Sequence, residues 1–110
     1  AIRRIEEIIT IENIDCDFRR LDGYLFPGPS HTPDDLEKEA EAAREAGLAD
    51  VAILPQGPQG SPYSGPCLRF ARQARFHPLK YLAGLEQAVL RKGGRIFCRT
   101  KALKLEKEKT

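Results

Sequence analysis

The amino-acid sequence predicts an α+β domain in which three helices cover mostly one face of a largely antiparallel sheet of about five strands. Apolar residues recur at helical spacing in three segments and alternate with polar residues in several short runs. An Asp-Gly pair of the kind that closes hairpins lies between two of these runs. With 110 residues, the chain is expected to form one domain that buries a core of its own.

The N-terminal segment is expected to form a helix followed by a hairpin. Isoleucines recur at helical spacing from residue 2 to about Asn13, and Asn13 is an acceptable left-handed stop. Two strands are then expected over about residues 15–21 and 24–27. Asp22-Gly23 would join them, because both turn residues must tolerate a positive φ.

The second helix has the clearest start and stop signals of the chain. Thr32 can cap its N-terminus, Pro33 suits the first helical position, and Asp35 completes a pattern that resembles a capping box. Leu36 and small alanines form a narrow apolar seam, and Gly47 is expected to end the helix. The small side chains indicate close packing on a sheet.

A short strand over residues 50–54 precedes a loop over residues 55–66, which contains four prolines and three glycines. Residues 67–76 then alternate, which predicts another strand. Its apolar side is expected to belong to the core, with Phe76 as a core residue. Arg72 interrupts that apolar side. The other side would present Arg69, Gln73, Arg75 and His77, and we expect Arg69, Gln73 and His77 to form a polar row.

The last predicted helix begins at Pro78 and ends at Gly93-Gly94. Its expected buried stripe consists of Leu79, Leu82, Leu85, Val89 and Leu90. A final strand is expected over residues 95–99, and the charged segment beyond it has only weak alternation.

Composition and charge exclude several classes of protein. The net charge of +2 is far from that of a dedicated nucleic-acid binder, and no apolar run is long enough for a membrane helix. Three cysteines without a C-x-x-C pair indicate small buried side chains in a reducing compartment, so we expect a cytoplasmic protein. The absence of Met leads us to expect a piece of a longer protein.

The residues also lack the common signatures of cofactor, metal and nucleophile sites. No G-x-G-x-x-G fingerprint occurs, so we expect no FAD or NAD bound by this chain alone. No spaced Cys and His set predicts a metal site, and no nucleophile with a poised base predicts a catalytic residue. The remaining candidate is the polar row near the start of the last helix, which could receive an anion such as a carboxylate. The alternative is that its arginines are solvated and that His77 caps the helix.

Several motifs resemble FAD-dependent oxidoreductases of the D-amino-acid oxidase superfamily, which includes glycine and sarcosine oxidases. They are Gly65-Pro66-Cys67-Leu68-Arg69-Phe70, then Gln73, then Phe76-His77-Pro78-Leu79-Lys80-Tyr81-Leu82-Ala83-Gly84-Leu85, and finally Gly93-Gly94-Arg95-Ile96. Upstream, Ile14-Asp15-Cys16-Asp17-Phe18-Arg19-Arg20 and then Asp22-Gly23-Tyr24-Leu25-Phe26 are similar to the same proteins. The resemblance is to a bacterial subgroup that often carries a C-terminal Rieske domain.

This resemblance implies that residues 1–100 form the substrate-binding, or cap, domain of a larger flavoprotein, and that residues 101–110 lead back to its FAD domain. The implied partners are that FAD domain and a small amine or amino acid, with no nucleic acid and no membrane. The implied reaction is removal of a hydride from a carbon next to nitrogen, with FAD bound in the full-length protein and the isolated piece inactive. The residues that the resemblance implies for substrate binding are Tyr24, Arg69, Gln73, His77 and Lys80.

Two other classes of function remain open from the residues themselves. A stand-alone module could use the same sheet face to bind a partner protein or an anion. A nucleic-acid binder could use Arg69, Arg72, Arg75 and Lys80, but alternating strand positions would place these cations on opposite faces.

Overall fold

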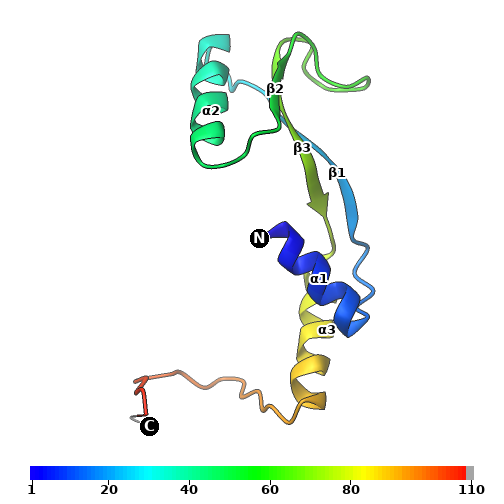
Figure 1. The fold of residues 1–110 in the computed structure, drawn as a ribbon, viewed down its shortest axis with the longest axis vertical. Coiled ribbons are helices and arrows are strands. Elements are labelled where there is room, and N and C mark those ends of the chain that lie inside the picture. The colour runs from blue at the N-terminus through cyan, green and yellow to red at the C-terminus, as the bar shows by residue number, and fades with distance from the viewer. Residues whose placement is uncertain (109–110) are drawn as a thin grey trace.

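The computed structural model describes residues 1–108 and contains three helices and three strands (Figure 1). The strands form one antiparallel sheet in the order β1-β3-β2. In chain order the elements are α1 (Ile2–Glu12), β1 (Arg19–Leu25), α2 (Pro33–Glu45), β2 (Val51–Leu54), β3 (Cys67–Arg75) and α3 (Pro78–Arg91).

The α+β class and the antiparallel sheet are confirmed, but the expected number of about five strands is wrong. Asp22-Gly23 does not close a hairpin, because β1 runs through both residues and pairs along its length with the long strand β3. Residues 95–99 form no strand, because no described strand lies beside them to complete a ladder. Whether each of these two segments forms the expected strands therefore depends on a pairing partner distant in the sequence.

The main core lies between α2 and one face of the sheet. Leu36 and Ala40 of α2 pack with Val51 of β2 and Leu68 of β3, and all four side chains are buried. The start of α2 is as expected from sequence, with Thr32 as the N-cap and its backbone N–H donating to Asp35 Oδ2 at 2.9 Å. The capping pattern and the alanine seam thus place α2 directly on the strands.

A second, smaller contact joins α1 to α3. The left-handed Asn13, with φ of 51°, ends α1 as predicted and directs the buried Ile14 towards α3. A Cβ atom placed at Gly84 would lie 2.5 Å from Ile14 Cγ2, so only glycine leaves room for this contact. Ile14 and Gly84 thus form the close apolar contact of this interface.

We expect Gly84→Val to separate α1 from α3, because the added side chain overlaps Ile14. Overpacking of this kind lowers the free energy of unfolding by about 1–3 kcal/mol. Ala83→Val is the matched control, since it adds a β-branched side chain at the exposed neighbouring position and should cost only about 0.7 kcal/mol through helix propensity. Thermal unfolding of the two variants measures the difference, and equal losses would contradict the Ile14 contact.

The predicted buried stripe of α3 is wrong for four of its five residues. Leu79, Leu82, Val89 and Leu90 are exposed, and Leu79 has 72% of its surface accessible. Phe76 is also only partly buried and stacks edge-on against Tyr81, with 5.3 Å between ring centroids. The spacing of apolar residues identified the helix correctly, but the described residues supply no surface that covers this side of it.

The chain is elongated and does not enclose the single large core expected from its length. Its radius of gyration is 19.8 Å, whereas a compact domain of this size has about 13 Å. It exposes 9287 Å² of surface, compared with about 6,100 Å² for a compact globular protein of 12.3 kDa. In Figure 1, α2 and the paired α1 and α3 lie at opposite ends of the ribbon formed by β1 and β3.

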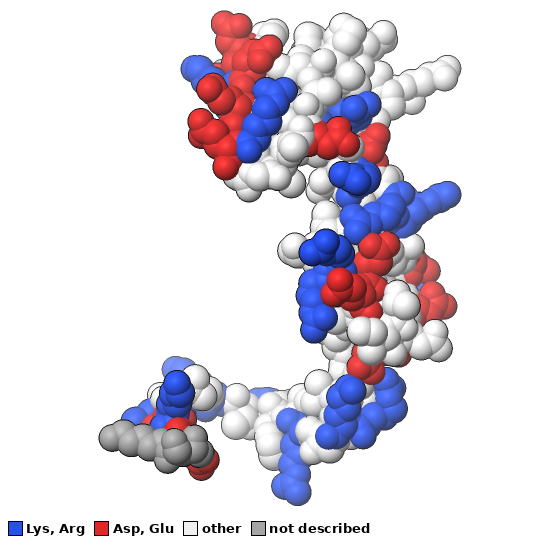
Figure 2. Space-filling model, viewed as in Figure 1, with Lys and Arg blue, Asp and Glu red and all other residues white. Residues whose placement is uncertain are grey.

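Charged side chains are unevenly distributed over this shape. Acidic side chains gather over α2, and basic side chains are prominent over the middle of the molecule below it (Figure 2). Within residues 1–108, no helix combines the length and the apolar character that crossing a bilayer requires.

Candidate functional site

An extra residue in β3 determines which side chains share a face of the sheet. Leu21 of β1 pairs with Gln73 of β3, but Gly23, only two residues later, pairs with Phe70. Three residue steps in β3 therefore oppose two steps in β1, which is the pattern of a β-bulge. Arg72 lies in this bulge with a left-handed backbone, at φ of 53°.

The bulge breaks the polar row predicted from alternation. Directly paired residues share a face, so Gln73 lies on the same side as Leu21, Gly23 and Phe70. The position of Gln73 agrees with this, since its Cγ would lie 3.3 Å from a Cβ at Gly23. Arg69 pairs with Tyr24 and with Ala52, on the opposite side of the sheet. The expectation that Arg69 and Gln73 belong to one row is therefore wrong.

We call the side of the sheet that carries Tyr24, Ala52 and Arg69 the Arg69 face. It is turned away from α2, which packs on the side of Leu68 and Phe70. Of the five predicted site residues, Tyr24 and Arg69 lie side by side on this face. Tyr24 is 37% exposed, and the Arg69 side chain is 34% exposed, so both can meet a molecule outside the sheet.

Arg69 has hydrogen-bonding capacity that the described residues do not use. Its Nε is buried and has no hydrogen-bond partner. Its Nη2 lies 4.0 Å from Asp50 Oδ1, at the limit of an ion pair and too far for a hydrogen bond. A guanidinium presents donors in a planar fork that matches a carboxylate, so Arg69 is suited to receive such a group.

His77 and Lys80 have partners of their own near the α1 end of the molecule. His77 caps α3, where its Nδ1 accepts from the backbone N–H of Lys80 at 3.3 Å. This confirms the alternative reading of His77 as a helix cap. Lys80 Nζ lies 3.1 Å from Asp17 Oδ2, and hydrogen bonding to that carboxylate raises the pKa of Lys80. No hydrogen bond or ion pair among the described residues joins either side chain to Arg69.

An ion pair links α1 to β1 beside the bulge. The Nε and Nη2 atoms of Arg20 donate to Glu6 Oε2 at 3.2 and 2.6 Å. These hydrogen bonds lower the pKa of Glu6 below its ordinary value. A carboxyl whose pKa is lowered by folding stabilises the fold above its unfolded pKa, and this stabilisation is lost as the pH falls through the folded pKa.

We therefore expect the melting temperature of Glu6→Gln to fall less steeply with decreasing pH than that of the wild type. Between pH 7 and the region below pH 4.5, the ordinary value for this group, the variant should lose less in melting temperature than the wild type. The effect is modest because both side chains are partly exposed. Glu37→Gln on α2 is the control, because residues 1–108 hold no ion-pair partner for Glu37. Parallel pH profiles of wild type and Glu6→Gln would contradict the linkage.

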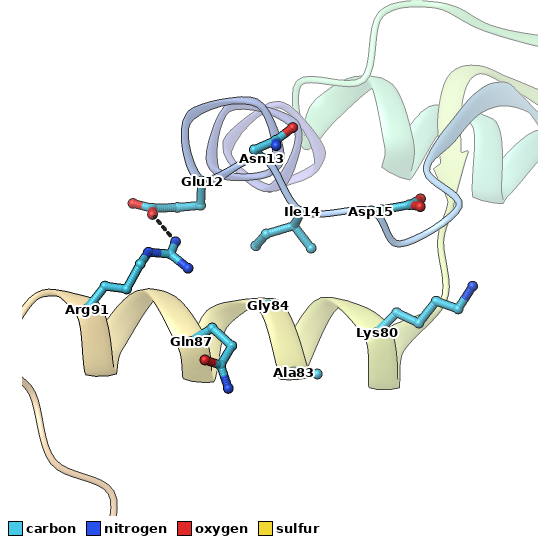
Figure 3. Close-up of a pocket in the computed structure, with 9 residues that line it drawn as sticks. All are labelled: Glu12, Asn13, Ile14, Asp15, Lys80, Ala83, Gly84, Gln87 and Arg91. Atoms are coloured by element: carbon cyan, nitrogen blue, oxygen red, sulfur yellow. Dashed lines mark hydrogen bonds and ion pairs between the residues drawn. The ribbon is translucent and has the colours of Figure 1, made fainter.

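A hollow of about 510 Å³ between α1 and α3 was not anticipated from the sequence (Figure 3). Ile14 and Gly84 form part of its wall, and Lys80 lies at one end. At the other end the Glu12 carboxylate binds Arg91 Nη2 at 3.1 Å. The residues that line it come from two segments about 70 positions apart in the sequence. The sequence signal nearest to this hollow is therefore Gly84, a glycine inside the third helix.

The described residues hold no cluster of three or more His, Cys, Asp or Glu side chains suited to a metal ion. The three cysteines are free, and two of them, Cys16 and Cys67, are buried. Burial raises the pKa of Cys16, which keeps its thiol protonated and unreactive near neutral pH.

Comparison with known proteins places the chain in a family. Residues 1–110 match the family described as DAO, FAD dependent oxidoreductase. The chain belongs to this FAD-dependent oxidoreductase family. The resemblance inferred from the sequence motifs is therefore confirmed. No solved structure matches the chain.

One relative of this FAD-dependent oxidoreductase chain is a Bacillus subtilis (strain 168) protein named "Putative Rieske 2Fe-2S iron-sulfur protein YhfW". The two are 36% identical over 109 residues, which cover 97% of this chain and 21% of the relative. The chain thus spans about a fifth of the length of the curated relative that it matches.

Proposed function

We propose that this chain is the substrate-binding part of an FAD-dependent oxidoreductase that oxidises an amine or amino-acid-like molecule carrying a carboxylate. The observation that carries the proposal is Arg69, whose partly exposed guanidinium lies beside Tyr24 on the side of the sheet away from α2, with the Asp50 carboxylate 4.0 Å from its Nη2. Membership of the FAD-dependent oxidoreductase family supports the redox chemistry.

Each residue of the pair has a distinct role in this proposal. The Arg69 guanidinium binds the substrate carboxylate, and the Tyr24 hydroxyl donates a second hydrogen bond to it. Asp50 lies near enough to orient the guanidinium but does not neutralise it through a close pair. Together the two side chains fix one end of the substrate, so that its amine-bearing carbon is held in one orientation.

The residues of this chain do not fit the role of holding FAD themselves. The chain contains no G-x-G-x-x-G sequence to receive the pyrophosphate at a helix N-terminus. We therefore propose that another part of the same polypeptide binds FAD and that this part is the partner of the present chain. When bound there, FAD would supply the redox chemistry that removes a hydride from the carbon next to the substrate nitrogen.

The exposed apolar surface supports packing against that other part. The exposed leucines of α3 and the excess accessible surface indicate an area that a neighbouring domain would cover. We propose no nucleic-acid or membrane partner, and the three free cysteines support a cytoplasmic location.

The test uses the full-length protein with its flavin. Oxidised flavin absorbance is followed without oxygen after addition of a panel of amino acids and of the corresponding amines that lack the carboxylate. We expect bleaching by one or more amino acids and little by the matched amines. Bleaching by neither group, or by both equally, would contradict a carboxylate-binding role for the Arg69 face.

A further inference from the structure

Two side chains of β1, the strand paired with β3, form hydrogen bonds to the bulge of β3. The backbone N–H of Arg72 donates to Asp22 Oδ1 at 3.1 Å. The backbone carbonyl of Arg72 accepts from Arg20 Nη1 at 2.8 Å. Both polar groups of the bulged residue are thus satisfied by side chains rather than by the β1 backbone. The same Arg20 also binds Glu6 of α1.

This arrangement compensates for an unfavourable backbone conformation. Arg72 has φ of 53°, a region that residues other than glycine seldom adopt. Without the two side chains, β3 could take regular pairing through residues 71 and 72. Because side chains alternate, such a change moves every residue on one side of the bulge to the other face of the sheet.

We propose that Asp22 and Arg20 are positioning residues that lock the Arg72 bulge and thereby keep Arg69 beside Tyr24 on the face away from α2. The inference rests on the proposed function of Arg69 in carboxylate binding. It adds that β1 determines which residues of β3 can reach the substrate. Asp22, which resembles a hairpin residue in the sequence, acts here through the backbone of the neighbouring strand.

The experiment measures carboxylate binding by the full-length flavoprotein, with acetate as the probe and the flavin absorption spectrum as the readout. We expect Asp22→Ala to weaken acetate binding about tenfold, because Arg72 loses a hydrogen bond to a charged group. Asp22→Asn should retain affinity within about twofold, because its amide oxygen can still accept from the Arg72 N–H. FAD content should be unchanged in both variants.

Replacing Arg72 with glycine should restore acetate binding to Asp22→Ala, which would not occur if Asp22→Ala only destabilised the fold. In Asp22→Ala combined with Arg72→Gly, the left-handed backbone no longer carries a steric penalty. We expect the double variant to recover most of the acetate affinity. Asp34→Ala is the matched control, since it removes an equal charge from the exposed first turn of α2.

Hydrogen exchange of residues 67–75 in the full-length protein provides a readout that does not depend on the ligand. We expect the Arg72 amide to exchange faster in Asp22→Ala than in the wild type and in Asp34→Ala. Unchanged exchange together with unchanged acetate affinity would overturn the inference. So would failure of Arg72→Gly to restore binding in the double variant.

Arg69→Ala separates this inference from the proposed function. If Arg69→Ala weakens acetate binding and Asp22→Ala does not, the positioning role is wrong and the carboxylate site stands. If acetate leaves the wild-type flavin spectrum unchanged, or if Arg69→Ala binds it as the wild type does, the proposed function is wrong and the inference falls with it.

Discussion

Leu68→Ala is expected to lower the free energy of unfolding by about 2–5 kcal/mol. Leu68 is completely buried between Leu36 and Ala40 of α2 and Val51 of β2. Removing three carbon atoms leaves a cavity at the centre of the contact that holds α2 on the sheet. Because this core has so few buried residues, little neighbouring packing is available to fill the space. Thermal or denaturant unfolding of the full-length protein measures the loss.

Leu105→Ala is the control for this prediction. Leu105 is 99% exposed, so the same chemical change should alter stability by no more than about 0.5 kcal/mol. A Leu68→Ala protein as stable as Leu105→Ala would contradict the assignment of Leu68 to the face that α2 covers, and with it the register of β3.

Arg69→Ala in the full-length enzyme is expected to reduce kcat/KM for an amino-acid substrate by about 10²–10³-fold. Removing one partner of a desolvated, hydrogen-bonded charge pair costs about 2–5 kcal/mol, and the proposed carboxylate would lose both hydrogen bonds of the guanidinium fork. Amines without a carboxylate should react with unchanged kcat/KM. Steady-state kinetics with a matched pair of substrates measures both effects.

Arg75→Ala provides the matched control, because it removes the same charge from the same strand. Arg75 is exposed and pairs with Arg19, which places it on the side of Gln73 rather than with Arg69. We expect its kinetics to match the wild type within about twofold. Equal losses in Arg69→Ala and Arg75→Ala would indicate a general effect of charge and would contradict a specific role for the Arg69 fork.

The helices could be predicted from the sequence because their signals are local. Pro33 and Pro78 each begin a helix in the structure, and Thr32 and His77 cap those helices. Asn13 ends α1 in the left-handed conformation, and Gly93 has a positive φ beyond the end of α3. Each of these features depends on the covalent preferences of one residue and its neighbours within a turn.

The candidate site could be predicted only in part. Tyr24 and Arg69 were both named from the sequence, and the structure pairs them directly. Strict alternation along residues 67–76 predicts Gln73 on the same side as Arg69, whereas the bulge moves it to the opposite side. Residues 67–75 contain no glycine, so the local sequence gives no signal for the left-handed backbone of Arg72. The hydrogen bonds that hold it come from Asp22 and Arg20, about 50 residues earlier.

The sequence by itself determined the positions and ends of the helices, the presence of a strand at β3 and the family to which the chain belongs. The tertiary structure alone decided that Asp22-Gly23 continues a strand, that residues 95–99 have no strand partner, and that Arg69 and Gln73 face opposite sides. The reason is physical. Caps and turns are stabilised within a few residues, whereas strand pairing, register and burial require a second segment whose contacts can override local preference.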